Sequence, residues 1–346
     1  MTKESFVLDH PELPYLDAAE PKALQAYLVS TKRLTPGEYV KQVARAGEGN
    51  MNCVVRVTTN RKSFILKQSR PWVEKYPQIA APWDRALAEV RFYAAIADTP
   101  GVASMMPRVL WSDDAARLLA LEDLGEAADF FPLYRGDIHL SDETMRALLA
   151  YLSALHAIPL TPAQQAALAN REMRALNHAH IFDLPLRADN GFPLESFTPG
   201  LGAVAVSLQQ DRAYVAAVHD LGRRYLADGS TLLHGDFFPG SFLRVPTGLR
   251  IIDPEFGFAG EAEFDLGVLL AHLHLARQPA TLVARACSLY RPAGKFSIAL
   301  ARQFAGVEIM RRLIGIAQLP LAADLDEKRR LLELSRRLVL QPDEKS

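Results

Sequence analysis

Cysteine is scarce in this sequence of 346 residues, which contains only Cys53 and Cys287. Two cysteines in separate halves of a chain cannot form the disulfide framework of a small secreted domain, so we expect both to be buried reduced thiols. An excess of one charge is also lacking, since 39 Lys and Arg balance 40 Asp and Glu. Proteins that bind nucleic acid usually carry a basic balance or stripe, so nucleic acid is not an expected partner.

Long hydrophobic runs are missing as well. The most apolar stretch, residues 264–276, is interrupted by Asp265, His272 and His274, and it falls short of the roughly 20 residues that a membrane-spanning helix needs. The N-terminal residues 1–14 show no apolar core after a basic start, so they do not resemble a signal peptide. We therefore expect a cytoplasmic protein that makes no membrane contact.

Apolar material for a folded core is present, because 49% of the residues are hydrophobic and 23% are charged. This balance speaks against disorder. The length is large for one compact domain and suits two lobes around a cleft.

The first part of the chain is rich in predicted strands. Two β-rich runs joined by four polar residues predict an antiparallel hairpin, and apolar residues at helical spacing predict a helix that precedes Pro100. The expected strands are 51–58, 63–68, 108–112 and 118–122, and the expected helices are 17–30 and 83–97.

Helical periodicity dominates after residue 125. The expected helices are 142–157, 206–226, 264–277, 297–318 and 325–339, with a long loop at 185–202 and short strands at 231–233, 242–245 and 249–252. This order predicts an α+β fold with a small, mostly β lobe before a larger, mostly α lobe and a site in the cleft between them. We place the N-terminal lobe at 1–122, a hinge at 123–126 and the C-terminal lobe at 127–346.

Two acidic residues follow apolar pairs in the second lobe. Asp236 comes after Leu232-Leu233-His234-Gly235, and Asp253 comes after Ile251-Ile252. Each carboxylate therefore sits where a buried strand opens into a loop, and the hairpin between them brings the two side by side. Close carboxylates repel unless a cation lies between them, and Mg²⁺ binds one or two carboxylates together with phosphate oxygens. A base for a hydroxyl and a metal carboxylate are the groups that phosphoryl transfer needs.

The alternative interpretation is structural. Asp after Gly and Asp before Pro are common turn residues, and either element alone is compatible with a turn. Both elements together, in this order and after a β-rich lobe, favour the functional interpretation.

The pattern HGD, then Ser241 five residues after Asp236, then an Asp-led motif resembles the aminoglycoside-phosphotransferase-like kinases, which share the two-lobed protein-kinase-like fold. Most members carry Asn at the position of Ser241. The Ser, the DPEF motif and the continuation to Ala276 are similar to 5-methylthioribose kinases. The resemblance implies that Asp236 is the catalytic base and contacts the substrate, that Asp253 and Glu255 are metal ligands, and that ATP and Mg²⁺ are the cofactors.

A glycine-containing loop precedes the first strand of the hairpin. Its residues Gly47, Gly49, Asn50 and Asn52 can let backbone amides approach phosphates closely. A Gly-x-Gly pair alone is usually only a turn. A strand lysine beneath such a loop is the kinase arrangement for holding the phosphates, and Lys67 is placed for it.

The expected partner of Lys67 is Glu89, on the helix 83–97. The alternative is a solvated pair between Arg85 and Glu89. The resemblance favours the pair between Lys67 and Glu89, which kinases require. It also places the hinge at Glu122 and Leu124, whose main-chain groups would bind adenine.

The predicted helix 297–318 contains adjacent arginines, Arg311 and Arg312, among apolar residues. Buried charges need partners. Glu308 can pair with one arginine, which leaves the other for a transferred phosphoryl group. Spacing does not tell which arginine pairs with Glu308 and which binds the phosphoryl group. The alternative is that both arginines lie at the rim of the protein and extend into water. The resemblance to a twin-arginine helix favours contact with the substrate.

Histidines at i,i+2 spacing, His178 with His180 and His272 with His274, point apart on a helix. We interpret them as packing or loop residues.

The expected function is an ATP-dependent kinase for the anomeric hydroxyl of 5-methylthioribose or a close 5-substituted ribose, in methionine salvage, with a small sugar as partner. The resemblance also implies a homodimer. Alternatives are a kinase of the same fold for another sugar, an amino alcohol or an aminoglycoside, and a pseudokinase that only binds.

Overall fold

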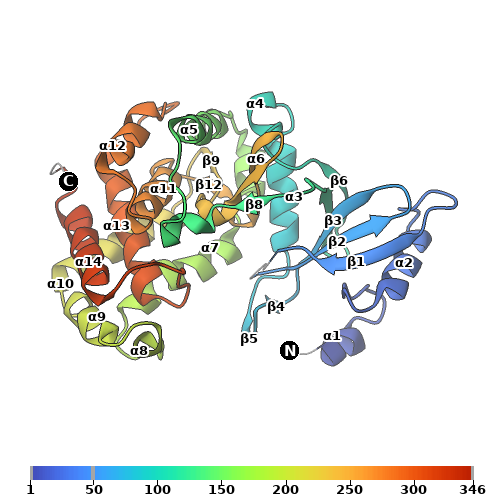
Figure 1. Cartoon of the computed structure of the whole chain (residues 1–346), viewed down its shortest axis with the longest axis horizontal. Helices are drawn as coiled ribbons and strands as arrows, with labels where there is room; N and C mark the ends of the chain where they lie inside the picture. The colour runs from blue at the N-terminus through green and yellow to red at the C-terminus, as the bar shows by residue number, and fades with distance from the viewer. Residues whose placement is uncertain (1–2, 48–50, 344–346) are drawn as a thin grey trace.

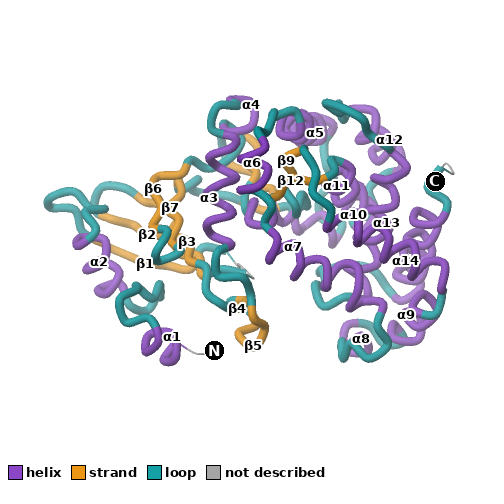
Figure 2. Tube along the Cα trace, turned by 180° about the vertical axis from the view of Figure 1, so that it is seen from behind, coloured by secondary structure: helices purple, strands orange, loops and turns teal. Residues whose placement is uncertain are grey.

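The structure of the protein is a computed structural model that describes residues 3–47 and 51–343. Its N-terminal part is built around a β-sheet, and its C-terminal part is mostly helical (Figure 1). Helix α3 (Arg85–Ile96) stands between the two parts in both ribbon views (Figures 1 and 2). No helix of the described ranges combines the length and the apolar character that a bilayer span requires.

The N-terminal sheet has five antiparallel strands in the order β1-β2-β3-β7-β6. These strands are β1 (Val40–Arg45), β2 (Cys53–Thr59), β3 (Ser63–Gln68), β6 (Val109–Asp113) and β7 (Leu118–Glu122). Strand β2 alternates buried and half-buried residues, as expected of a strand with one covered face. The central strand β3 places Lys67 opposite Val54 and Leu119.

The other elements of this part are α1 (Lys3–Asp9), α2 (Pro21–Ser30), the hairpin β4 (Trp72–Val73) with β5 (Tyr76–Ala80), and α4 (Pro100–Ala103). Helix α2 packs against β1, and α4 packs against α3. The predicted helix 17–30 starts only at Pro21, because proline suits the first helical turn. Helix α1, strand β1 and the β4–β5 hairpin were not predicted.

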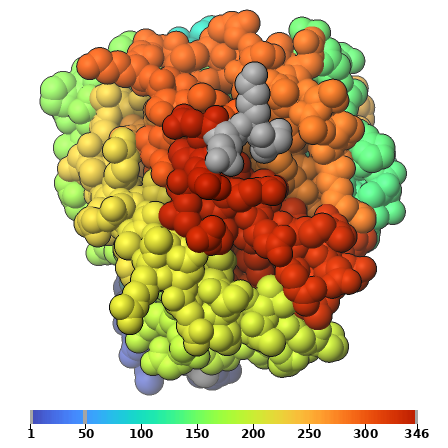
Figure 3. All heavy atoms as spheres, turned by 90° about the vertical axis from the view of Figure 1, so that its left-hand side faces the viewer, coloured from blue at the N-terminus to red at the C-terminus, as the bar shows by residue number. Residues whose placement is uncertain are grey.

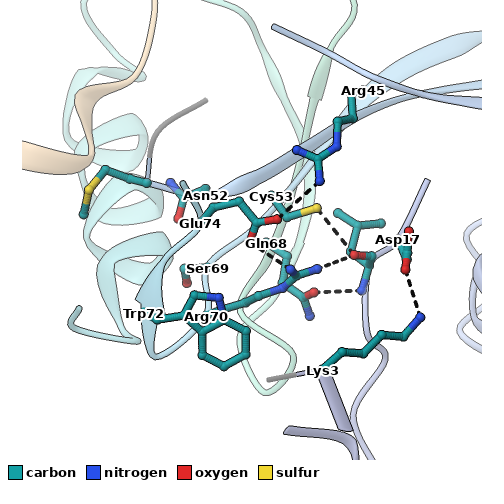
Figure 4. Close-up of polar contacts among 12 residues, drawn as sticks. Lys3, Asp17, Arg45, Asn52, Cys53, Gln68, Ser69, Arg70, Trp72 and Glu74 are labelled. Carbon is teal, nitrogen blue, oxygen red and sulfur yellow. Dashed lines mark hydrogen bonds and ion pairs between the residues drawn. The ribbon is translucent and has the colours of Figure 1, made fainter. Parts of the chain in front are cut away.

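The segment that precedes α2 is bonded to strand β3. The Leu16 N–H donates to Gln68 Oε1 at 2.9 Å, and Gln68 Nε2 donates to the Pro14 carbonyl at 2.8 Å. Figure 4 shows Arg70 reaching the same segment and Glu74. The N-terminal residues thus support the strand that carries Lys67.

Two small sheets in the C-terminal part carry the acidic loops. One has the order β11-β10-β8, with β8 (Ala128–Asp129), β10 (Phe242–Val245) and β11 (Gly248–Ile251). The other pairs β9 (Thr231–Leu233) with β12 (Phe258–Gly260). The short helical turns η4 (Pro239–Ser241) and η5 (Pro254–Phe256) follow the two acidic positions.

Helices form the rest of the C-terminal part, in which α11 packs along α13 and α13 packs against α14. The helical elements are η1 (Phe131–Arg135), α5 (Asp142–His156), α6 (Pro162–Ala167), α7 (Arg171–His178), η2 (Ala179–Asp183), η3 (Leu184–Leu186), α8 (Leu194–Phe197), α9 (Leu201–Gln209), α10 (Arg212–Leu226), α11 (Glu263–Leu275), α12 (Ala280–Leu289), α13 (Ile298–Ile314) and α14 (Leu325–Leu340). Figure 3 shows α14, in red, lying across the end of the molecule beside the yellow-green residues of α9 and α10.

Two predicted helices were wrong in extent. The helix expected at 206–226 is two helices, because Asp211 interrupts it and caps α10 by accepting bonds from the N–H groups of Ala213 and Tyr214. The helix expected at 297–318 ends at Ile314, since Gly315 adopts an extended conformation. The short helices α7 and α12 were not predicted.

Candidate active site

Lys67 lies between two carboxylates contributed by different parts of the fold. Its Nζ is 2.7 Å from Glu89 Oε2 on α3 and 2.9 Å from Asp253 Oδ1 at the start of η5. The expected ion pair with Glu89 is therefore present. Burial alone would lower the pKa of Lys67, but the adjacent carboxylates raise it above its usual range, so the lysine is charged.

Glu89 is completely buried beneath Lys67. The contact is an ion pair rather than a directed hydrogen bond, because neither Glu89 oxygen has a well-aligned donor among the described residues. Burial raises the pKa of Glu89 to about 7, and the Lys67 ammonium opposes this rise.

Arg85 does not pair with Glu89, so the alternative considered for that glutamate was wrong. Its buried guanidinium donates from Nε to Asn52 Oδ1 at 2.7 Å. Asn52 Nδ2 in turn donates to Glu255 Oε2 at 2.6 Å. The other donors of Arg85 bond main-chain carbonyls of Met51, Arg70, Trp72 and Pro82.

This network joins the end of the glycine-containing loop to the DPE motif of the other part of the chain. The Asn52 side chain, labelled in Figure 4, is thus occupied by protein groups. Its role in nucleotide binding stays a prediction. Nothing in the local sequence around Arg85 indicated a buried guanidinium, because its hydrogen-bond partners come from three separate segments.

The loop that carries Asp236 is held by a buried carboxylate on helix α11. Asp265 accepts hydrogen bonds from the His234 N–H at 2.6 Å and the Gly235 N–H at 2.9 Å. Gly235 has φ +82°, and a Cβ there would lie 2.1 Å from the Phe256 carbonyl oxygen. Only glycine fits this position. Asp265 was not among the predicted site residues, although a lone acid in an apolar helix was a usable signal.

His234 braces the two acidic loops against each other. Its Nε2 lies 3.0 Å from the Ile252 carbonyl oxygen, and its Nδ1 lies 3.4 Å from the Asp236 N–H. A carbonyl can only accept, so Nε2 carries the hydrogen. Burial lowers the pKa of His234, which favours this neutral ring. Ser241 Oγ donates to the Asp236 carbonyl at 2.8 Å and closes the turn.

Asp253 occupies the left-handed region, with φ +61°, which is uncommon for a residue other than glycine. About half of its side chain is exposed. Glu255 is buried next to Asn52. In the described ranges no group of three or more His, Cys, Asp or Glu side chains could hold a metal ion by itself. The chemistry of this pair fits Mg²⁺, which accepts one or two carboxylates and takes other ligands from phosphate and water.

Both arginines of α13 approach Asp236. Arg311 Nη2 is 3.5 Å and Arg312 Nη2 is 3.4 Å from Asp236 Oδ1. The expectation that only one of them pairs with Glu308 was wrong. Arg311 Nε lies 2.5 Å from Glu308 Oε2, and Arg312 Nε lies 2.8 Å from Glu308 Oε1. One carboxylate serves both because it sits one helical turn away from each.

The Asp236 side chain is about one fifth exposed. Burial raises its pKa above the ordinary 3.8, and the two guanidinium groups oppose that rise. Burial alone would also raise the pKa of Glu308, but Arg311 and Arg312 hold it well below its usual range.

The structure shows less about the remaining predicted nucleotide-binding residues, which belong to the glycine-containing loop and the hinge. Gly49 and Asn50 lie outside the described residues. Gly47 has φ +72°, and a Cβ built there would meet no described residue within 4 Å. The Glu122 N–H donates to the Arg108 carbonyl at 2.9 Å. Within the described chain the N–H of Leu124 has no protein acceptor, so it is available to a ligand. The adenine contacts stay predictions.

Two cavities of about 230 and 270 Å³ lie away from these residues, one beside Tyr15 and Leu24 and the other beside His139 and Gln278. The candidate site brings together a half-exposed carboxylate beside a lysine, and a second carboxylate beside two guanidinium groups.

The chain is similar in sequence to curated methylthioribose kinases. The chain is 28% identical to a methylthioribose kinase of Bacillus pumilus, over 81% of this chain and 79% of that protein. It is 25% identical to a methylthioribose kinase of Geobacillus thermodenitrificans, over 85% of this chain and 86% of that protein.

Among solved structures, LicA in complex with AMP superposes with a TM-score of 0.53 at 13% identity, and the match covers 93% of this chain and all of that one. The predicted α+β fold of the aminoglycoside-phosphotransferase-like kinases is confirmed. The family model described as phosphotransferase enzyme family matches residues 42–297. The chain therefore belongs to the phosphotransferase enzyme family.

Proposed function

We propose that this protein transfers the γ-phosphoryl group of ATP to the anomeric hydroxyl of 5-methylthioribose or of a close 5-substituted ribose. The observation that carries the proposal is the approach of both Arg311 and Arg312 to Asp236 Oδ1. A base flanked by two cations suits a neutral acceptor that receives an anionic group, and it disfavours a cationic aminoglycoside or amino alcohol. The names of the curated relatives support the choice of sugar.

In this reaction the oxygen of the acceptor hydroxyl bonds to the γ-phosphorus, and Asp236 accepts the proton that this hydroxyl loses. The bond between that phosphorus and the β,γ-bridging oxygen breaks, and ADP leaves. Lys67 is placed to hold the α- and β-phosphates. Arg311 and Arg312 offer planar donors to the phosphoryl oxygens, a geometry in which arginine is not replaced by lysine.

Asp253 and Glu255 would hold Mg²⁺, which supplies charge neutralisation at the β- and γ-phosphate oxygens when bound. Asn52 and Arg85 keep Glu255 in a single orientation. The carboxylates are therefore arranged before the nucleotide enters.

The test of the acceptor is a coupled ADP-release screen across 5-methylthioribose, other 5-substituted riboses, unsubstituted ribose, amino alcohols and aminoglycosides. We expect the highest kcat/KM with 5-methylthioribose, and phosphorus NMR of the product should show a sugar 1-phosphate. A preference for an amino alcohol or an aminoglycoside would overturn the proposed substrate but would leave the transferase chemistry intact.

A second prediction concerns the metal. Asp253→Asn should abolish turnover while the melting temperature changes little, because the side chain is half exposed. The parent enzyme should lose activity in excess chelator and regain it when Mg²⁺ is restored. Full activity of the variant, or of the parent in excess chelator, would contradict the metal role of Asp253.

A further inference from the structure

Three buried side chains form a row of hydrogen bonds that ends at Glu308, the carboxylate shared by Arg311 and Arg312. Tyr134 Oη on η1 is 2.5 Å from His272 Nδ1 on α11, and His272 Nε2 is 3.0 Å from Glu308 Oε1 on α13. Each of the three residues is 1% exposed. His272 is thus not the simple packing residue that its spacing suggested. It connects two helices and the turn that follows strand β8.

The direction of these hydrogen bonds follows from the chemistry of Glu308. Its pKa is held far below the usual range, so the carboxylate only accepts, and His272 Nε2 must carry the hydrogen. The ring is neutral, because burial lowers the pKa of His272 to about 4. Nδ1 is therefore an acceptor, and the Tyr134 hydroxyl donates to it. Both hydrogen bonds are therefore donated in the direction of Glu308, from Tyr134 to His272 and from His272 to Glu308.

Glu308 transmits this order to the arginines. Its Oε1 accepts from both His272 Nε2 and Arg312 Nε, and its Oε2 accepts from Arg311 Nε. Each guanidinium is thereby turned so that its Nη2 faces Asp236. The Arg312 guanidinium also lies 4.7 Å from the centre of the Phe238 ring, which packs 5.1 Å from His272.

We propose that Tyr134 and His272 are positioning residues, which hold Glu308 and through it keep Arg311 and Arg312 in place around the acceptor hydroxyl. This inference rests on the proposed function. A carboxylate that accepts from two arginines could turn about its own side-chain bonds. The third donor, from His272, removes that freedom because the ring is itself fixed by Tyr134.

His272→Leu tests the proposal. We expect kcat to fall by about 10²-fold, the usual effect of misplacing a reacting group by about 1 Å, while KM for ATP stays within about twofold. The acid limb of the kcat profile should also move to higher pH by about one unit. Four charged groups face Asp236, namely Arg311, Arg312, Glu308 and Asp253. When the arginines loosen, they lower the pKa of Asp236 less, so the base is protonated at higher pH.

Conservative and control variants separate positioning from general stability. His272→Gln can place an amide N–H near the position of Nε2, so it should recover most of kcat and the parental acid limb. Tyr134→Phe removes the donor to His272 Nδ1, and its kcat should fall between those of the parent and His272→Leu. His274→Leu is the matched control, because it lies on the same helix and its ring bonds no group in the described part of the chain. It should leave the profile unchanged.

A measurement that needs no acceptor substrate distinguishes a failure of the positioning role from a failure of the proposed function. Nitrogen NMR of the histidine-labelled protein should show His272 as the neutral Nε2–H tautomer from pH 6 to pH 8, and Tyr134→Phe should shift its Nδ1 signal. If the parent rejects 5-methylthioribose, the proposed function falls, and the rate measurements are made with the acceptor that the screen identifies. An unshifted acid limb in His272→Leu, or an Nδ1–H tautomer in the parent, would overturn the positioning role.

Discussion

Asp236→Asn is expected to lower kcat by about 10²–10⁴-fold, the usual contribution of a general base, with little change in ATP affinity. The amide matches the carboxylate in size but cannot take the proton of the acceptor hydroxyl. The Asp236 side chain contacts Arg311 and Arg312 and no residue that we assign to nucleotide binding. Nucleotide binding should therefore be nearly unaffected.

The measurement pairs steady-state kinetics with calorimetric titration of ATP. Asp189→Asn, at an aspartate whose side chain is 81% exposed, is the control and should behave like the parent. A large loss of ATP affinity with kcat preserved would show that Asp236 is a structural or metal-binding residue.

Glu308→Gln is expected to lower the free energy of unfolding by about 3–5 kcal/mol, because removing one partner of a buried ion pair leaves the other charge uncompensated. Here one carboxylate balances two guanidinium groups, each less than 10% exposed. Urea unfolding at pH 7 measures the loss. Glu333→Gln on the exposed face of α14 is the control and should change stability by less than about 0.5 kcal/mol.

The difference in unfolding free energy between the parent and Glu308→Gln should depend on pH with a defined sign. The folded protein holds the pKa of Glu308 well below its ordinary 4.5. The stabilisation by its charge is therefore complete above that value and is lost only as the pH falls toward the lower, folded-state pKa. Parent and variant should converge in acid. A difference that stays constant down to pH 3 would mean that the charge of Glu308 does not stabilise the fold.

The sequence by itself determined the elements and the chemistry. The β-rich run at β3 and the apolar, helix-compatible stretches at α11 and α13 placed the main strands and helices, because these patterns depend on neighbours a few residues apart. The apolar pairs before Asp236 and Asp253 located both carboxylates at strand ends. The pair between Lys67 and Glu89 was predicted from a resemblance, since spacing alone left Arg85 as an alternative partner of Glu89.

Only the tertiary structure decided which buried polar side chains pair with one another. Arg85 donates hydrogen bonds to three separate segments, Asp265 holds the loop of Asp236 from another helix, and Glu308 accepts from two arginines and His272 together. Periodicity reports which face of an element is buried. It does not report which buried polar groups of different elements meet, because such partners lie tens to hundreds of residues apart and are brought together only when α3, α11 and α13 pack. Since a buried charge must find such a partner, the packed fold determines the arrangement of the site.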